Sequence, residues 1–106
     1  MSFISRLFQG GGDSGGGRVD GPGARKLVAD GAFLLDVRTP VEFREAHVPD
    51  AINIPVSELG ARISEVPTDR DVVVYCRSGG RSARAAGILA HAGYSSVPDL
   101  GPMSAW

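Results

Sequence analysis

Short apolar runs alternate along the chain with stretches in which apolar positions recur at helical spacing. The runs are nearly continuous, as is typical of strands buried on both faces of a sheet. They predict strands at 32–37, 51–54 and 71–75, and a weaker one at 96–100. Pro98 lies inside the last run and cannot donate to a β-ladder, so this strand should be very short or broken.

Two helix starts carry recognisable capping residues. Asp20 is placed to cap a helix over about residues 22–29, and Gly31 lies just past its end. Thr39, followed by a proline and by Glu42 at the third helical position, predicts a second helix that opens with a capping box.

Two more helices are predicted from apolar periodicity. The first is stopped by Pro67, and the second begins near Arg81 and ends at Gly93. The positions predicted to face inward are Val56, Leu59, Ile63 and Val66 in the first helix, and Ala85, Ile88, Leu89 and Ala92 in the second.

Strands that alternate with helices predict an α/β fold with an open, mostly parallel sheet and helices on both of its faces. The length of 106 residues allows one domain. A hydrophobic content of 42% is sufficient for a core.

The first residues differ in composition from the rest of the chain. Eight of the 15 glycines lie between Gly10 and Gly23. We therefore interpret residues 1–18 as a short apolar segment followed by a flexible Gly-rich linker, and 19–106 as the domain. The apolar segment has helical spacing and is either a loosely held tail or a docking helix for a partner or a membrane surface. Its apolar residues are Phe3, Ile4, Leu7 and Phe8.

Charge and cysteine content narrow the class of protein. With 11 basic and 12 acidic residues the net charge is −1, which argues against a nucleic-acid-binding surface. One cysteine cannot form an internal disulfide, and with two histidines it is too little for a Cys-rich zinc site, so we predict no metal and no cofactor. No apolar run is long enough for a signal peptide or a transmembrane segment, and we predict a cytoplasmic protein.

The strongest candidate for chemistry is Cys76, which directly follows the clearest predicted strand. Ligands of open α/β sheets bind at the carboxyl ends of strands. Here a Gly-Gly turn and a helix start follow the cysteine, and both favour an anion. Nearby arginines favour the thiolate, which would be a nucleophile and a receptor for an anionic substrate. The predicted anion-binding loop is Arg77, Ser78, Gly79, Gly80 and Arg81.

The segment Tyr75-Cys-Arg-Ser-Gly-Gly-Arg-Ser82 closely resembles the active-site loop of rhodanese-type sulfurtransferases. Three further segments, in the family's order, resemble its Asp-x-Arg-x-x-x-Glu, His-Ile-x-Gly-Ala-x-Asn-Ile-Pro and Gly-Gly-Met-x-Ala-Trp motifs. They are Leu35–Phe43, His47–Pro55 and Asp99–Trp106. The resemblance covers residue 19 onward and implies a rhodanese-like fold, with Cys76 as the nucleophile and the loop as its anion cradle. The chain departs from the family at Ala46, Asp50 and Pro102, where glycine is common.

Other residues are secondary candidates. Asp36 and Arg38 follow a strand that should end at the same edge of the sheet as Cys76. Ser82 either hydrogen-bonds the cysteine sulfur or caps the following helix, and the sequence favours the cap. We interpret His47 as a structural residue that ties a loop to the sheet, rather than as a general base.

The length of the loop after the cysteine distinguishes sulfurtransferases of this family from related phosphatases. The spacing here is Cys-x4-Arg, whereas related phosphatases use a longer Cys-x5-Arg loop, and Ser82 stands where their arginine would be. The shorter loop favours sulfur transfer over a phosphatase or an arsenate reductase. We therefore predict a thiosulfate sulfurtransferase that forms a persulfide on Cys76.

Thiosulfate or another sulfane-sulfur donor would load this persulfide, and a thiophilic acceptor would unload it. The acceptor would be cyanide in an assay, and a small thiol or a thiol protein in the cell. The alternative is a persulfide carrier that binds one protein partner, for which thiosulfate turnover would be incidental.

Overall fold

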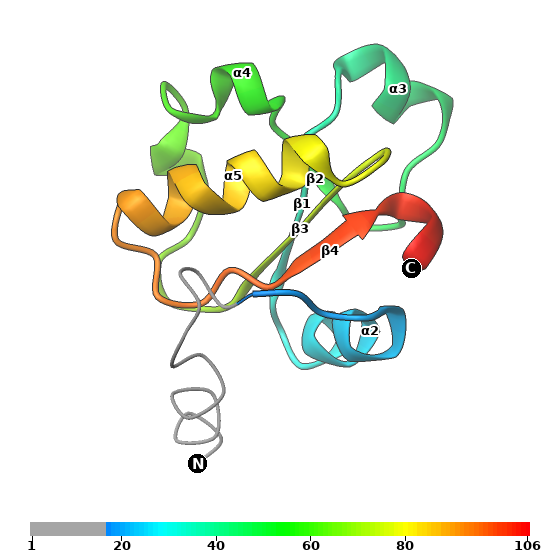
Figure 1. Ribbon diagram of the computed structural model, residues 1–106, viewed down its shortest axis with the longest axis horizontal. Helices are drawn as coiled ribbons and strands as arrows, with labels where there is room; N and C mark the ends of the chain where they lie inside the picture. The colour runs from blue at the N-terminus through cyan, green and yellow to red at the C-terminus, as the bar shows by residue number, and fades with distance from the viewer. Residues whose placement is uncertain (1–16) are drawn as a thin grey trace.

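A computed structural model describes residues 17–106, so the apolar segment and most of the linker lie outside the described residues. Four strands form one sheet in the order β2-β1-β3-β4, and each neighbouring pair is parallel (Figure 1). The strands are β1 (Phe33–Asp36), β2 (Ile52–Asn53), β3 (Val72–Cys76) and β4 (Asp99–Pro102). The predicted α/β fold with a parallel sheet is confirmed.

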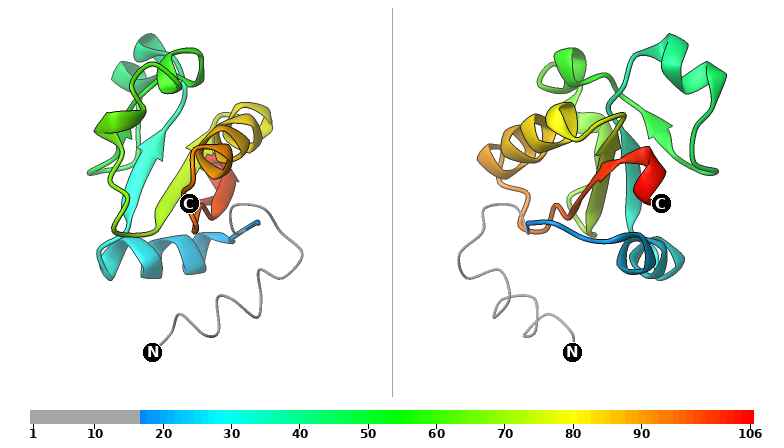
Figure 2. Two further views of the ribbon diagram at one scale, coloured as in Figure 1. Left: turned by 90° about the vertical axis from the view of Figure 1, so that its left-hand side faces the viewer. Right: turned by 45° about the vertical axis from the view of Figure 1, so that its right-hand side comes forward.

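Helices cover both faces of the sheet (Figures 1 and 2). α4 (Val56–Leu59) and α5 (Gly80–His91) pack on one face, and α2 (Gly21–Ala29) packs on the other. β3 contributes side chains to the core on both faces of the sheet, because successive side chains of a strand point to opposite faces. Val72, Val74 and Cys76 belong to the core under α5, whereas Val73 and Tyr75 belong to the core over α2.

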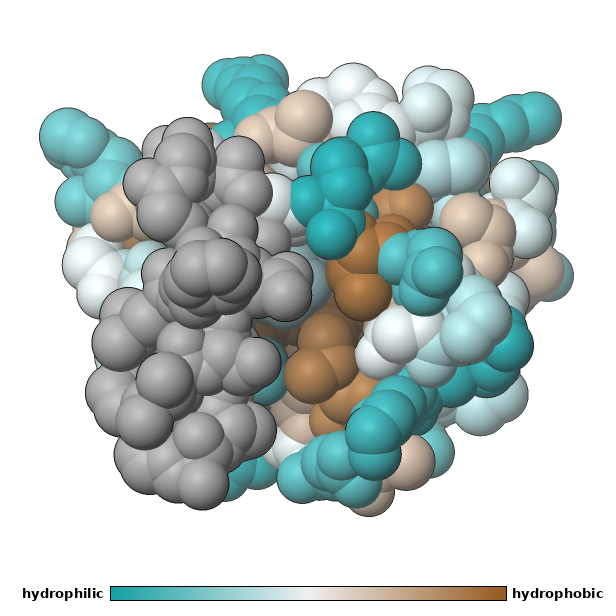
Figure 3. Space-filling view, turned by 60° about the horizontal axis from the view of Figure 1, so that its bottom comes forward, coloured by the Kyte–Doolittle hydropathy of each residue, from teal (hydrophilic) through white to brown (hydrophobic). Residues whose placement is uncertain are grey.

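The α2 side keeps some apolar surface between hydrophilic side chains (Figure 3). Leu27 and Val28 of α2 pack on the core but stay partly exposed. In the part of the chain that the structure describes, no helix combines the length and the apolar character needed to cross a membrane.

Both capped helix starts are confirmed. The side chain of Asp20 accepts a hydrogen bond of 2.8 Å from the Gly23 amide, which satisfies a free N–H of α2. At the start of α3 (Pro40–Glu45), Thr39 and Glu42 exchange the two hydrogen bonds of a capping box.

The predicted helix up to Pro67 is wrong in one respect, because it divides into α4 and a 3₁₀ helix, η3 (Ile63–Glu65). Gly60, a poor helix former, follows α4, and Arg62 has φ −112° and ψ 21°, outside the helical range. All four predicted inward positions nevertheless pack on the core under α5. In α5, Ala92 is exposed instead of inward, because the helix ends one residue before it.

The last strand lies further along the chain than predicted. β4 begins directly after Pro98, which has no N–H to donate. The carbonyl of Pro98 still accepts a hydrogen bond of 3.0 Å from the Val74 amide, so Pro98 joins the pairing with β3 through its carbonyl alone. Residues 17–19 run beside β4, and Arg18 forms a parallel bridge with Asp99.

Asp50 adopts a left-handed backbone conformation with φ 72°, at a position where the family often has glycine. A side chain in this region costs free energy that glycine does not. We expect Asp50→Gly to raise the free energy of unfolding by about 1 kcal/mol, measured by urea denaturation. Asp50→Ala, which lacks the local hydrogen bonding of an aspartate, should lower it. A loss of stability in the glycine variant would contradict this explanation.

Candidate active site

Cys76 is the last residue of β3. The sequence predicted that it would directly follow the strand. Its side chain is 0% exposed and lies at the carboxyl edge of the central strand. The next two residues, Arg77 and Ser78, are exposed. Cys76 is therefore buried, although the start of the loop that directly follows it is exposed.

The backbone of the loop turns at Gly79 and aims an amide at the sulfur. Gly79 has φ +111°, a conformation that glycine adopts without strain. Its N–H donates a hydrogen bond of 2.9 Å to the Sγ atom of Cys76. Gly79 is also the N-cap of α5, so the positive end of the helix dipole lies next to the sulfur.

Two opposing influences act on the pKa of the Cys76 thiol. Burial, the largest single influence, would raise it. Hydrogen bonds from the Ser82 hydroxyl and from the backbone amides of Ser82, Gly79 and Ser78 together outweigh burial, so the pKa lies below its ordinary value. This arrangement can hold negative charge on the sulfur.

Ser82 is buried in the first turn of α5 and does not cap the helix, since the cap is Gly79. Its hydroxyl lies 3.1 Å from the carbonyl of Gly79. A hydroxyl has one proton, so it donates to the sulfur of Cys76 only when it turns away from that carbonyl. The favoured interpretation of Ser82 as a helix cap is therefore wrong, because its hydroxyl donates to the Gly79 carbonyl instead of accepting from a free N–H of α5.

The lowered pKa has a direct test, because the chain has one cysteine. We expect the thiolate absorbance of the folded protein to appear at a lower pH than that of the same protein unfolded in urea. A midpoint for the folded protein at or above that of the unfolded protein would contradict the hydrogen-bond argument.

Arg81 makes a contact that the sequence did not indicate. Its Nη1 and Nη2 atoms donate to Oε1 and Oε2 of Glu42 at 2.6 and 3.0 Å. The sequence indicates only the capping box as the role of Glu42. This ion pair joins α3 to the start of α5, and it lowers the pKa of Glu42 to about 2. With the residues that the structure describes, Arg77 and Arg84 form no salt bridge.

Asp36 and Arg38 lie at the expected edge of the sheet, but they bind each other. Arg38 donates to both carboxylate oxygens of Asp36, with a shortest distance of 2.7 Å, and both side chains are almost fully buried. Arg38 also donates to the carbonyl of Ala46 at 2.6 Å, which holds the end of α3. Their contacts indicate support of the site, not contact with a substrate.

His47 is exposed and stacks on Phe43, with ring centroids 3.7 Å apart. Its Nδ1 atom lies 2.7 Å from the carbonyl oxygen of Phe43. The prediction that His47 ties a loop to the sheet is wrong, since its contacts are with α3 itself.

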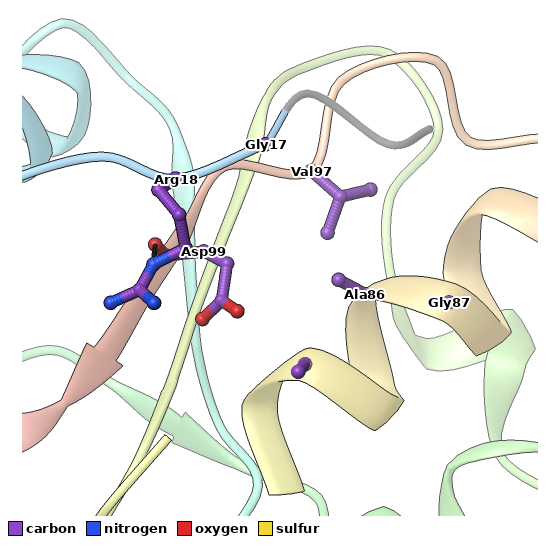
Figure 4. A pocket seen from close by; sticks show the side chains of 7 residues that line it. Gly17, Arg18, Ala86, Gly87, Val97 and Asp99 are labelled. Carbon is purple, nitrogen blue, oxygen red and sulfur yellow. Dashed lines mark hydrogen bonds between the residues drawn. The ribbon is translucent and has the colours of Figure 1, made fainter. Parts of the chain in front are cut away.

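A separate hollow of about 260 Å³ opens between residues 17–18, α5 and β4 (Figure 4). It is lined by Gly17, Arg18, Ala83, Ala86, Gly87, Val97 and Asp99. None of these residues belongs to the predicted loop. Within residues 17–106, no three His, Cys, Asp or Glu side chains are grouped so that they could hold a metal ion.

Known proteins are similar to this chain in sequence and in fold. The family model of the rhodanese-like domain matches residues 23–106. A sulfurtransferase of Allochromatium vinosum is 42% identical over 91 residues, which cover 83% of this chain and 85% of that protein. The chloroplastic thiosulfate sulfurtransferase 16 of Arabidopsis thaliana is 40% identical over 96 residues, 78% of this chain and 80% of that protein.

Among solved structures, a rhodanese with anions from E. coli is 36% identical, with a TM-score of 0.66 over 71% of this chain and 91% of that one. The relatives support rhodanese-type sulfur transfer. By the family match and by these identities, the chain belongs to the rhodanese-like domain family.

Proposed function

We propose that the protein is a thiosulfate sulfurtransferase that works by double displacement through a persulfide on Cys76. The observation that carries the proposal is the sulfur of Cys76 beneath a Cys-x4-Arg loop whose Gly79 amide donates to it at 2.9 Å. Such a loop can stabilise a thiolate and, after transfer, the terminal sulfur of a persulfide.

In the first half-reaction the thiolate of Cys76 attacks the outer sulfur of thiosulfate. A new S–S bond forms to Cys76, the S–S bond of thiosulfate breaks, and its electron pair leaves with sulfite. One thiolate and one dianion become one persulfide anion and one dianion, so charge is conserved and no proton, metal or oxidant is required.

Because Cys76 is fully buried, the loop must open far enough for the donor to reach the sulfur. We propose that Arg77, which is exposed, and Arg81 attract the dianion and stabilise the charge that develops on sulfite. The 36% identical rhodanese from E. coli was solved with anions, which supports an anion as the donor.

In the second half-reaction an acceptor nucleophile attacks the outer persulfide sulfur, and Cys76 leaves as a thiolate. Cyanide becomes thiocyanate, and a thiolate becomes a persulfide. The chain has no second cysteine to resolve the persulfide, so the acceptor is external to the chain. We propose a small thiol or a thiol protein as the acceptor in the cell.

Arg81→Ala tests the role of the loop arginine. We expect kcat/KM for thiosulfate to fall about tenfold, the loss typical of one charge-assisted contact to an anion. Steady-state kinetics with cyanide as acceptor measure this. Arg84→Ala is the matched control, because Arg84 is exposed, lies one turn further along α5 and should leave the kinetics unchanged. Unchanged kinetics in Arg81→Ala would refute the role given to Arg81.

A further inference from the structure

Arg81, the last residue of the loop, is bound to Glu42 of α3 instead of being free for a donor. We infer that Glu42 is a specificity-determining residue that competes with the anionic donor for Arg81, and so sets the affinity of the site for dianions. This inference rests on the proposed function, since it concerns the donor of that same site.

The carboxylate of Glu42 is held in place by its own helix. Its Oε1 atom accepts from the backbone amide of Thr39 at 2.9 Å and from the Thr39 hydroxyl at 3.1 Å, in addition to Arg81. Glu42 therefore cannot follow Arg81 toward the sulfur without breaking the capping box of α3. When a donor binds, Arg81 has to leave Glu42.

Arg81 is close enough to the site for this exchange to matter. The charge of Cys76 is among the influences that raise the pKa of Arg81, after the hydrogen bond to Glu42. The pair is partly exposed, with side-chain exposures of 34% for Arg81 and 20% for Glu42, so an anion in solvent can reach the guanidinium. Two oxygens of a sulfonate group can accept the same two N–H bonds that the carboxylate now accepts.

The pair also reduces the positive charge that the sequence assigns to the loop. Arg38 is neutralised by Asp36 and Arg81 by Glu42, which leaves Arg77 as the loop arginine without an acidic partner among residues 17–106. A weakly binding or uncharged molecule does not displace a bidentate carboxylate, whereas a dianion can. The competition therefore lowers the affinity of the site for dianions and shortens the residence of sulfite after transfer.

Glu42→Gln is the sharpest test, because glutamine keeps the acceptor of the capping box and removes the charge. The probes are thiosulfate and sulfite, and binding is measured by calorimetry on the Cys76→Ser protein, in which no transfer can follow. We expect Glu42→Gln to tighten binding of both dianions about fivefold. The Glu42→Asp variant keeps the charge on a shorter side chain and should give a smaller gain.

Glu65→Gln is the matched control, because Glu65 also pairs with an arginine, Arg62. Residues 66–71 lead from η3 to the start of β3, so Glu65 lies toward the opposite edge of the sheet from Cys76. This variant should bind both anions as the parent does. Adding Arg81→Ala should remove the gain from Glu42→Gln, a non-additivity that a merely structural role of Glu42 would not produce.

Unchanged or weaker binding in Glu42→Gln would overturn the inference, and so would a gain that persists without Arg81. Failure of either anion to bind any variant would overturn it as well. The proposed function is judged separately, by sulfur transfer to Cys76 in the protein that retains both residues.

Discussion

Replacing Cys76 by serine is expected to lower thiosulfate turnover at least about 1000-fold, because the sulfur that becomes the persulfide is gone. A serine hydroxyl is not ionised near neutral pH and is a poor nucleophile toward sulfur. The chain contains no other cysteine that could take over the role. Thiocyanate formation from thiosulfate and cyanide measures the loss.

Because Cys76 belongs to the core under α5, the serine variant also needs a test of folding. Its circular dichroism and urea midpoint should show a folded protein. Turnover within about tenfold of the parent, in a folded serine variant, would refute the assignment of Cys76 as nucleophile.

Asp36→Ala is expected to lower the free energy of unfolding by about 3–5 kcal/mol, the largest stability effect that the structure indicates. The substitution leaves the guanidinium of Arg38 without its partner, and that side chain is 5% exposed. Removing one member of a buried ion pair costs more than the pair contributes, because the remaining charge is left uncompensated in the core.

Urea denaturation of Asp36→Ala measures this loss. Glu65→Ala breaks an ion pair in which both side chains are more than a third exposed, so it should lower the free energy of unfolding far less than Asp36→Ala does. Replacing Asp36 and Arg38 together by apolar residues of similar size should recover much of the stability. A loss below about 1 kcal/mol in Asp36→Ala would contradict the structural role of the pair.

The parts of the fold that local patterns determine could be predicted. The buried strands read as apolar runs, and Thr39 and Glu42 indicated their capping box because both partners lie within one turn. The loop after Cys76 was also foreseen, since a Gly-Gly turn between a strand and a helix has few other arrangements. Because Pro98 cannot donate a hydrogen bond, the sequence indicated that the last strand is short or broken. It did not show that the strand begins after the proline.

Contacts between distant residues could not be predicted. Glu42 and Arg81 are 39 positions apart, and nothing local shows that the first turn of α3 faces the first turn of α5. Asp36 and Arg38 were correctly placed at one edge of the sheet. Their position alone did not show that the two side chains would form a buried ion pair with each other.

These two ion pairs reduce the positive charge that is available to a substrate. Arg38, paired with Asp36, supports the end of α3. Glu42 binds Arg81, one of the two loop arginines. The groups that remain at the sulfur are backbone amides of the loop, of which Gly79 donates at 2.9 Å. These groups suit a small anion that arrives, transfers one atom and leaves.

Intact mass spectrometry tests the central claim most directly. The protein is treated with thiosulfate, measured, and then treated with cyanide and measured again, with Cys76→Ser alongside. The account predicts a gain of one sulfur atom that cyanide removes and that the serine variant never shows. No gain with thiosulfate, or an equal gain in the serine variant, would contradict a persulfide on Cys76 as the intermediate of sulfur transfer from thiosulfate.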